Sequence, residues 1–406
     1  MLVPRASDNE SDVETRVIAV KTTRPEAPAS HIDRSDILMA ALASSPVTMM
    51  LAPAGYGKTS VIASCVSLLE MDHTVVYYQC DRFDESPRLM VRACEEKLGL
   101  AAQEVSSSLS DMEAVATLLE HVRQQDAQFV LIIDNVEYLD FEESRAIATL
   151  LLRYRPANLK LVFSGRYLPF ARGSIGLLPD ITWLTTRDLS FSIAEFNALL
   201  ERQQLTLPSA EVPSLLRKMQ GWPAGLALWL MVWRCAGMPE RWSGELGLYE
   251  VSDYLRGEVI TNLAGPLRDL MCLCAVLGTF HDDLAKAVAP DIYAAADMQG
   301  LLALGLYLQE VPGRPEWFRM DPIVAQCLSR LRPADWRRDI HLRAFNWFRD
   351  RNDAIAALFH AGQSDHGAID SGWMAQQSDS ILASLDTQGP VSYTHLTLPT
   401  IRVVEV

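Results

Sequence analysis

One short loop carries residue types that bind phosphate. The segment Ala52-Pro-Ala-Gly-Tyr-Gly-Lys-Thr59 follows an apolar run and precedes a helical pattern that begins at Ser60. Its two glycines let backbone N–H groups curl toward an anion, and the following helix presents its positive end to the same anion. Lys58 has the length to reach the β- and γ-phosphates, and the Thr59 hydroxyl suits Mg²⁺. The loop predicts a nucleoside triphosphate site, although Ala52 replaces the usual first glycine. The predicted loop contacts are Ala54, Gly55, Tyr56, Gly57, Lys58, Thr59 and Ser60.

A second apolar run ends in an acid that suits the same metal. Phe129-Val-Leu-Ile-Ile133 has the profile of a strand buried on both faces, and Asp134 follows it directly. An acid in this place holds Mg²⁺ together with the loop hydroxyl. The next position commonly carries an acid that orients the attacking water, but here it is Asn135, and an amide cannot act as a base. Two activities are compatible with this residue: slow hydrolysis of the nucleotide, and a switch that binds the nucleotide without hydrolysing it. Glu137 is nearby, but nothing in the sequence directs it at the nucleotide.

A third candidate follows another strand. Residues 159–164 have a strand pattern, and Arg166 comes just after it, at the edge of the sheet where ligands bind. A guanidinium there suits recognition of a γ-phosphate. A surface salt bridge explains the same residue equally well. The predicted catalytic residues are Lys58, Asp134 and Arg166, and the predicted Mg²⁺ ligands are Thr59 and Asp134.

The elements around these motifs alternate between strands and helices. This order predicts a doubly wound parallel α/β sheet with right-handed crossovers. Beyond Leu184 helical patterns dominate, and a hairpin over 306–310 and 316–320 suits a winged helix. Residues 341–362 look like the first helical pair of a repeat array. The predicted domains are a flexible lead (1–30), an ATPase domain (31–190), a helical domain (191–245), a winged helix (246–335), the start of TPR-like helical repeats (336–390) and a terminal segment (391–406).

Composition excludes several classes of protein. The chain has 406 residues, a formal net charge of −15 and no long basic run, which argues against a nucleic-acid surface in these residues. The longest apolar stretch, 224–233, is too short to span a bilayer, and the polar N-terminus is not a secretory signal. We therefore expect a cytoplasmic protein that does not bind membranes. Its seven cysteines lack metal-type spacing and are expected to be buried thiols.

Four motifs occur in an order that is highly specific in combination. They are Ala52–Thr59, Ser164-Gly-Arg-Tyr-Leu-Pro169, Arg187-Asp-Leu-Ser-Phe191 with Glu195, and Gly221-Trp-Pro-Ala-Gly-Leu226. Together they resemble the ATPase core of the large LuxR-type transcriptional activators, the MalT-like branch of the STAND signalling ATPases. The resemblance covers residues 24–362.

The resemblance implies a nucleotide switch. Such cores hold ADP at rest and exchange it for ATP when activated, with Mg²⁺ as the metal. Pro223 would then lie near the base and ribose, although Gly221–Pro223 also has the pattern of a helix break. Arg34 would lie close to the adenine. The family commonly carries a phosphate-contacting His where this chain has Asp321, and a carboxylate there would weaken the ADP-bound resting state.

The resemblance also implies partners beyond the nucleotide. Relatives self-associate when ATP is bound, take a small-molecule inducer on their repeats, and bind DNA through a C-terminal helix-turn-helix. The inducer of this chain is not identified by its sequence. Two other functions stay open: a STAND ATPase joined to a kinase or defence enzyme, and a scaffold whose nucleotide is not hydrolysed.

The terminal segment differs from everything before it. Residues 391–400 resemble one reading frame of a transposase-based sequencing adapter, and a short natural β-rich terminus is the alternative. We therefore expect the natural sequence to stop near Pro390. On this interpretation the chain is an N-terminal fragment, without the remaining repeats and without the DNA-binding domain.

Overall fold

The chain divides into two compact units, and the boundary lies between Ala227 and Leu228. This boundary falls inside the predicted helical domain 191–245; residues 303–306 also belong to the first unit. The predicted segment 391–406, and the predicted repeats beyond 364, lie outside the described residues. The computed structural model describes residues 17–27, 31–81, 84, 88–97, 110–139, 142–169, 180–208, 211–236, 248–261, 263–296, 298–303, 307–311 and 313–364.

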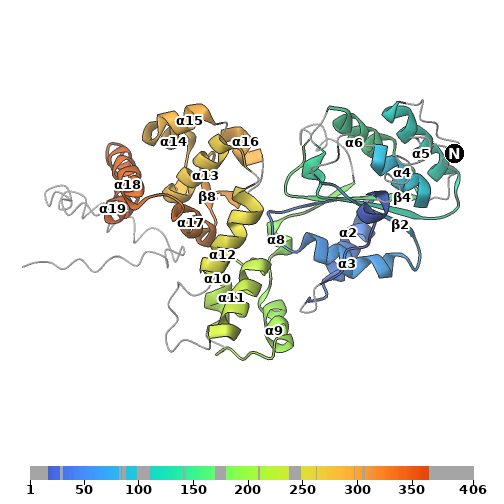
Figure 1. Ribbon diagram of the computed structural model, residues 1–406, viewed down its shortest axis with the longest axis horizontal. Coiled ribbons are helices and arrows are strands. Elements are labelled where there is room, and N and C mark those ends of the chain that lie inside the picture. The colour runs from blue at the N-terminus through green and yellow to red at the C-terminus, as the bar shows by residue number, and fades with distance from the viewer. Residues whose placement is uncertain are drawn as a thin grey trace, which may run out of the picture. The chain divides into compact units, whose positions relative to one another are not determined.

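A five-stranded parallel sheet forms the centre of the first unit (Figure 1). Its order is β2-β3-β4-β1-β5, and each neighbouring pair is parallel, which confirms the predicted fold class. The carboxyl ends of β1, β3 and β4 therefore meet at one edge, which is where ligands bind in open α/β sheets. The strands are β1 (Val47–Leu51), β2 (Thr74–Gln79), β3 (Phe129–Asp134), β4 (Leu159–Gly165) and β5 (Ile181–Leu184).

Helices cover both faces of this sheet (Figure 1). One face carries α2 and α3, and the other carries α4, α5 and α6. The second interface contains the buried side chains Leu131, Ile133 and Phe163 from the strands, with Leu118 and Leu151 from the helices. Burying each side chain of this kind contributes roughly 1.5–3 kcal/mol to folding. The helices are α2 (Ser35–Ser44), α3 (Lys58–Leu69), α4 (Arg88–Lys97), α5 (Asp111–Gln124) and α6 (Glu142–Tyr154).

A short helical stretch over residues 17–21 packs on the first unit. Ile18 joins the hydrophobic core, and Lys21 Nζ lies 2.6 Å from Asp84 Oδ2. Tyr78 donates its hydroxyl to the other oxygen of Asp84 at 2.7 Å. The predicted flexible lead therefore does not hold for this stretch. Its partners lie far along the chain, so local composition does not reveal them.

The first unit continues into helices beyond the sheet. A Ser192–Glu195 capping box begins α9, and α11 begins at Pro223, which fits the preference of proline for the first helical turn. These helices are α8 (Thr186–Leu189), α9 (Ile193–Arg202), α10 (Val212–Lys218) and α11 (Pro223–Ala236), the last of which ends in the second unit.

The second unit combines helices with a small antiparallel sheet of order β6-β8-β7. The pairing of β7 with β8 confirms the predicted hairpin, whereas the two-residue strand β6 was not predicted. The strands are β6 (Thr279–Phe280), β7 (Leu308–Glu310) and β8 (Phe318–Met320). The helices are α12 (Leu248–Leu255), a π-helix (Arg256–Ile260), α13 (Gly265–Leu277), α14 (Asp282–Val288), α15 (Pro290–Ala295), α16 (Met298–Ala303), α17 (Pro322–Ser329), α18 (Ala334–Arg349) and α19 (Ala354–Gln363).

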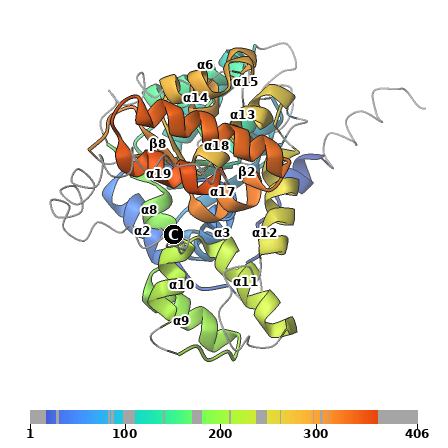
Figure 2. The same cartoon turned by 90° about the vertical axis from the view of Figure 1, so that its left-hand side faces the viewer.

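Helices α18 and α19 lie side by side, as the predicted helical pair requires (Figure 2). Between them, His341 Nδ1 lies 2.9 Å from His360 Nδ1, and both side chains are buried. The His360 ring also stacks on Phe348, with 5.4 Å between ring centroids. Burial lowers the pKa of both histidines. Neutral imidazoles suit this contact, since one nitrogen donates and the other accepts.

Asp321 begins α17 as its N-cap. Its Oδ1 accepts hydrogen bonds from the backbone N–H groups of Ile323 at 3.0 Å and Val324 at 3.2 Å. Burial raises the pKa of this carboxyl to about 6, although both N–H groups favour its charged form. Asp321 therefore has a structural role within its own helix, and its predicted effect on ADP stays a prediction.

In the described part of the chain, no helix has both the length and the hydropathy needed to cross a membrane.

Candidate nucleotide-binding site

The predicted phosphate loop joins β1 to α3. Gly55 and Gly57 both have a φ of 79°, a left-handed conformation that other residues adopt only with strain. Gly57 is also the N-cap of α3, and a Cβ built on it would meet no atom within 4 Å. The loop thus turns at its glycines beside open space. This geometry fits a cradle of backbone N–H groups for an anion.

Lys58 folds back over the loop from the first turn of α3. Its ammonium donates to the carbonyl oxygens of Ala52 at 2.6 Å and Pro53 at 3.1 Å. Burial lowers its pKa to about 8, while the negative charges of Glu137 and Asp134 oppose that change. The side chain therefore stays mostly cationic at neutral pH. A phosphate at the loop would compete with two carbonyl groups for this cation.

Thr59 and Asp134 meet at the end of β3. The Thr59 hydroxyl donates to Asp134 Oδ2 at 2.8 Å, and Tyr77 approaches the same oxygen at 3.3 Å. Asp134 is fully buried. A hydroxyl and a carboxylate are oxygen ligands of the kind that Mg²⁺ prefers, so these residues fit the predicted metal. Ser164, in register with Asp134 on β4, adds a buried hydroxyl that has no hydrogen-bond partner among the described residues.

Sequence reasoning did not single out Ser164. The available signal was a polar residue at the carboxyl end of an otherwise apolar strand, next to the strand that carries Asp134. An unpaired buried hydroxyl is costly, and a ligand or water in the site would give it a partner.

Arg166 and Glu137 form a pair just beyond the sheet edge. The backbone N–H of Arg166 donates to Glu137 Oε2 at 3.0 Å, and Arg166 Nε lies 3.3 Å from Glu137 Oε1. Both alternatives for Arg166 thus find support, since it makes a salt bridge and also lies at the predicted ligand-binding edge. Glu137 itself was not predicted to belong to the site.

The turn that contains Pro223 is bonded to the phosphate loop. Trp222 donates its indole N–H to the Ala54 carbonyl at 3.1 Å, and the Ala224 backbone N–H donates to the Gly55 carbonyl at 3.0 Å. The structure therefore brings Pro223 close to the loop, as the site prediction requires. The buried Trp222 was not a predicted site residue, and its signal was an indole donor inside an apolar segment. These two bonds use carbonyl groups of the loop and none of its N–H groups.

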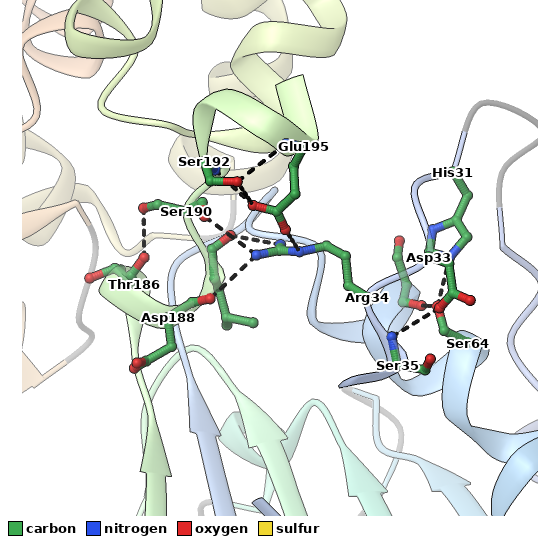
Figure 3. Close-up of polar contacts among 12 residues, drawn as sticks. His31, Asp33, Arg34, Ser35, Ser64, Thr186, Asp188, Ser190, Ser192 and Glu195 are labelled. Atoms are coloured by element: carbon green, nitrogen blue, oxygen red, sulfur yellow. Dashed lines mark hydrogen bonds and ion pairs between the residues drawn. The ribbon is translucent and has the colours of Figure 1, made fainter. Parts of the chain in front are cut away.

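Arg34 has a different setting, in which its guanidinium binds the end of α8 (Figure 3). Nη1 donates to the Leu189 carbonyl at 2.9 Å, and Nη2 donates to the carbonyls of Asp188 at 3.3 Å and Ser190 at 3.4 Å. Nε lies 2.6 Å from Glu195 Oε1 on α9. The structure therefore joins Arg34 to these elements and not to the phosphate loop. Its contact with adenine stays a prediction.

A chain of contacts connects Arg34 to the loop. The guanidinium lies 5.2 Å from the centre of the Phe191 ring, and the Phe191 backbone N–H donates to the Gly221 carbonyl at 2.7 Å. Gly221 has a φ of 69°, and a Cβ there would lie 2.9 Å from the Phe191 carbonyl. The next residue, Trp222, holds the phosphate loop. Three of the sequence motifs thus form one continuous network around the site.

Comparisons with known families support two domains. The model of the AAA domain family matches residues 43–171, and the model of the MalT winged helix domain matches residues 256–337. The first range contains the phosphate loop, Asp134 and Arg166. The second contains the antiparallel sheet and the N-cap Asp321.

Similar proteins align with most of this chain. The HTH-type transcriptional regulator MalT of Yersinia enterocolitica is 22% identical over 386 residues, which are 90% of this chain and 42% of that protein. The serine/threonine-protein kinase PknK of Mycobacterium tuberculosis is 27% identical over 363 residues, or 83% of this chain and 32% of that protein. The chain thus spans less than half the length of the curated relatives it matches.

A solved structure supports the fold. The Walker-type ATPase paby2304 of Pyrococcus abyssi aligns with a TM-score of 0.50 at 17% identity, over 72% of this chain and 94% of that one. The motifs, both family models and the MalT relatives agree with one another. This chain is similar to the MalT regulators, and it matches an AAA domain followed by a MalT-type winged helix, which confirms the resemblance inferred from its motifs.

Proposed function

We propose that this chain is the ATP- and ADP-binding switch module of a MalT-like transcriptional regulator. One observation carries the proposal: the Thr59 hydroxyl and the Asp134 carboxylate, distant in sequence, lie 2.8 Å apart beside a loop that turns on left-handed glycines. This pairing suits a magnesium ion bound together with nucleotide phosphates. Lys58 supplies the cation next to them.

The module distinguishes ATP from ADP by the γ-phosphate. Arg166 lies at the sheet edge and offers a guanidinium that suits a phosphate dianion. The bonds from Trp222 and Ala224 to the phosphate loop couple the start of α11 to the conformation of that loop. We infer that nucleotide exchange changes this geometry, and that the change is passed to the rest of the protein through α11.

The direct test measures nucleotide affinity by titrating a fluorescent ADP or ATP analogue with Mg²⁺ present. Lys58→Ala removes the cation beside the phosphates, so we expect affinity to fall about 100-fold or more, which corresponds to about 3 kcal/mol. Lys97→Ala is the matched control, because Lys97 is exposed at the end of α4. Circular dichroism checks that both variants fold. Unchanged affinity in folded Lys58→Ala would overturn the assignment.

Several properties of the whole protein belong to the same proposal. We propose that the ATP-bound form self-associates, that a small-molecule inducer acts on helical repeats, and that the protein works in the cytoplasm. The MalT relatives are named as HTH-type transcriptional regulators, and we assign DNA binding in such a protein to a part other than these acidic domains. Sedimentation with ADP and with a non-hydrolysable ATP analogue tests the first point. An unchanged mass would contradict it.

The similarity to the kinase PknK supports a second candidate, in which the same switch controls a kinase. The full sequence of the source gene separates the two candidates. A helix-turn-helix supports the regulator, and a kinase domain supports the alternative. A scaffold that never hydrolyses its nucleotide is distinguished from both by measuring ADP production with Mg²⁺.

A further inference from the structure

The residue after Asp134 points away from the phosphate loop. Asn135 has a left-handed backbone, with φ 57° and ψ 44°, which turns the chain sharply at the end of β3. Its side-chain amide lies 3.5 Å from the carbonyl of Cys80, which follows β2. The sheet order places β2 at the outer edge, on the side of β3 opposite β4 and β1. The position that commonly carries a water-orienting acid therefore holds an amide, Asn135, whose side chain is directed toward β2 and away from the phosphate loop.

The same turn brings another acid to the loop side. The 3-10 helix Val136–Tyr138 directs the buried Glu137 toward the end of β4, which lies between β3 and β1. A Cβ on Gly165 would lie 2.5 Å from Glu137 Oε2 and 2.7 Å from Val136 Cγ2. Glycine at 165 is thus what allows the carboxylate to approach the strand end so closely.

Charge places Glu137 at the phosphate site as well. Among the charged groups that influence the pKa of Lys58, Glu137 has the largest effect, ahead of the metal-binding candidate Asp134. The negative charge of Glu137 therefore acts on the cation that would contact the β- and γ-phosphates. Both carboxylate oxygens are engaged by Arg166 through its backbone N–H and its Nε.

We propose that Glu137, three residues beyond Asp134, is the water-activating residue of this site, taking over the role that Asn135 cannot perform. The inference rests on the proposed function, since it requires ATP at the loop. In the step, the water oxygen bonds to the γ-phosphorus and the bond from that phosphorus to the β–γ bridging oxygen breaks. Glu137 accepts the water proton, and ADP and inorganic phosphate leave.

The pair with Arg166 makes this activation conditional. While the Arg166 guanidinium is paired with Glu137, it holds Oε1 of the carboxylate. A γ-phosphate offers this guanidinium a competing anion, and movement of the guanidinium to the phosphate releases Oε1 for a water. Arg166 therefore links recognition of ATP to release of the base. ADP lacks the γ-phosphate and leaves the pair closed.

The test uses Glu137→Gln in the whole chain, with Glu120→Gln as the matched control, because Glu120 is exposed and pairs with Arg123 on the surface of α5. We expect kcat for ATP hydrolysis to fall about 100-fold in Glu137→Gln, the usual size of a general-base contribution. The control should keep the wild-type rate.

A binding measurement gives a readout that does not depend on turnover. Glutamine has no charge and holds the Arg166 guanidinium less strongly than glutamate does, so Glu137→Gln should bind a non-hydrolysable ATP analogue more tightly relative to ADP, by about 3- to 10-fold. A structural role alone would weaken both nucleotides equally.

Three results would overturn the inference while leaving the proposed function intact. They are wild-type turnover in Glu137→Gln, an equal loss of ATP and ADP binding in that variant, and a wild-type chain that binds MgATP but never hydrolyses it. Failure of the wild-type chain to bind ATP or ADP would instead refute the proposed function itself.

Discussion

The two units of this protein both bury ionisable groups, but they use them differently. In the first unit, Lys58, Asp134 and Glu137 come from three separate elements and converge at the carboxyl edge of a parallel sheet. In the second unit, Asp321 caps its own helix and His341 pairs with His360 between two adjacent helices. Burial of ionisable groups is common to both regions, so it cannot identify a site by itself.

What separates the two regions is the surroundings of these groups. The converging groups of the first unit lie beside a loop that turns on left-handed glycines, with open space at Gly57 and an unpaired hydroxyl at Ser164. The histidine pair of the second unit is enclosed by aromatic rings, and its two nitrogens satisfy each other. The first arrangement leaves capacity for a ligand, whereas the second stabilises the fold.

Arg34 tests this comparison most strongly. It is a buried charge in the first unit, yet its contacts hold helices together and do not reach the phosphate loop. Arg34→Ala leaves Glu195 and three carbonyl groups without their partner, and we expect the free energy of unfolding to fall by about 3 kcal/mol. Urea denaturation measures it. Arg123→Ala, which removes an exposed pair, should cost less than about 0.5 kcal/mol.

The same variant also tests whether Arg34 touches the nucleotide. A change in ADP affinity as large as that of Lys58→Ala, without loss of stability, would place Arg34 in the binding site and break the comparison. Loss of stability with a smaller effect on affinity would support its role in the network that leads to Trp222.

The histidine pair tests the other side of the comparison through pH. Burial depresses the pKa of both imidazoles, so their contribution to stability is present above about pH 6.5, the unfolded value, and is lost as pH falls toward the folded values. Arg337 adds to this effect at His341. We expect His360→Gln to lose less stability than the wild type between pH 7 and pH 4.5, by about 1–2 kcal/mol.

Urea midpoints at both pH values measure this difference, with the less buried His121→Gln as control. The control should follow the wild-type pH dependence. If His360→Gln also followed it, the pair would not be neutral in the folded protein, and its description as a closed structural element would be wrong.

Trp222→Phe is the smallest change and tests the bond between the helical segment and the phosphate loop. It keeps an aromatic ring next to Gly225 but leaves the Ala54 carbonyl without its indole donor. We expect a loss of about 1 kcal/mol in stability and a several-fold loss in ADP affinity. Thermal unfolding with and without ADP measures both. Trp183→Phe, at a half-buried position on β5, should leave ADP affinity unchanged.

The strands and the phosphate loop of the first unit could be predicted from the sequence, because each is specified by residues that lie next to one another in the chain. The apolar run before Asp134, the glycines of the loop and the strand pattern over residues 159–164 each specify an element within a few residues. The same reasoning missed β6, because a strand of two residues has no periodicity, and it missed the packed stretch around Ile18, because only distant partners hold it there.

The candidate site was predictable in part for the same reason. Motif spacing was enough to bring Lys58, Thr59 and Asp134 together, since strand ends in a parallel sheet share one edge. The direction of a side chain beyond a strand end depends on the turn that follows. The left-handed Asn135 and the lack of a side chain at Gly165 decide that Glu137 reaches the end of β4, and neither effect has a sequence pattern of its own.

The sequence by itself determined the chemistry of this protein: a phosphate loop, a metal-binding acid, alternating strands and helices, and the order of motifs shared with MalT-like proteins. Only the tertiary structure decided which groups serve the nucleotide and which serve the fold. Arg34 contacts Leu189 across 155 positions of sequence, and Trp222 contacts Ala54 across 168. Contacts at such separations arise from packing of whole elements, so no local pattern encodes them.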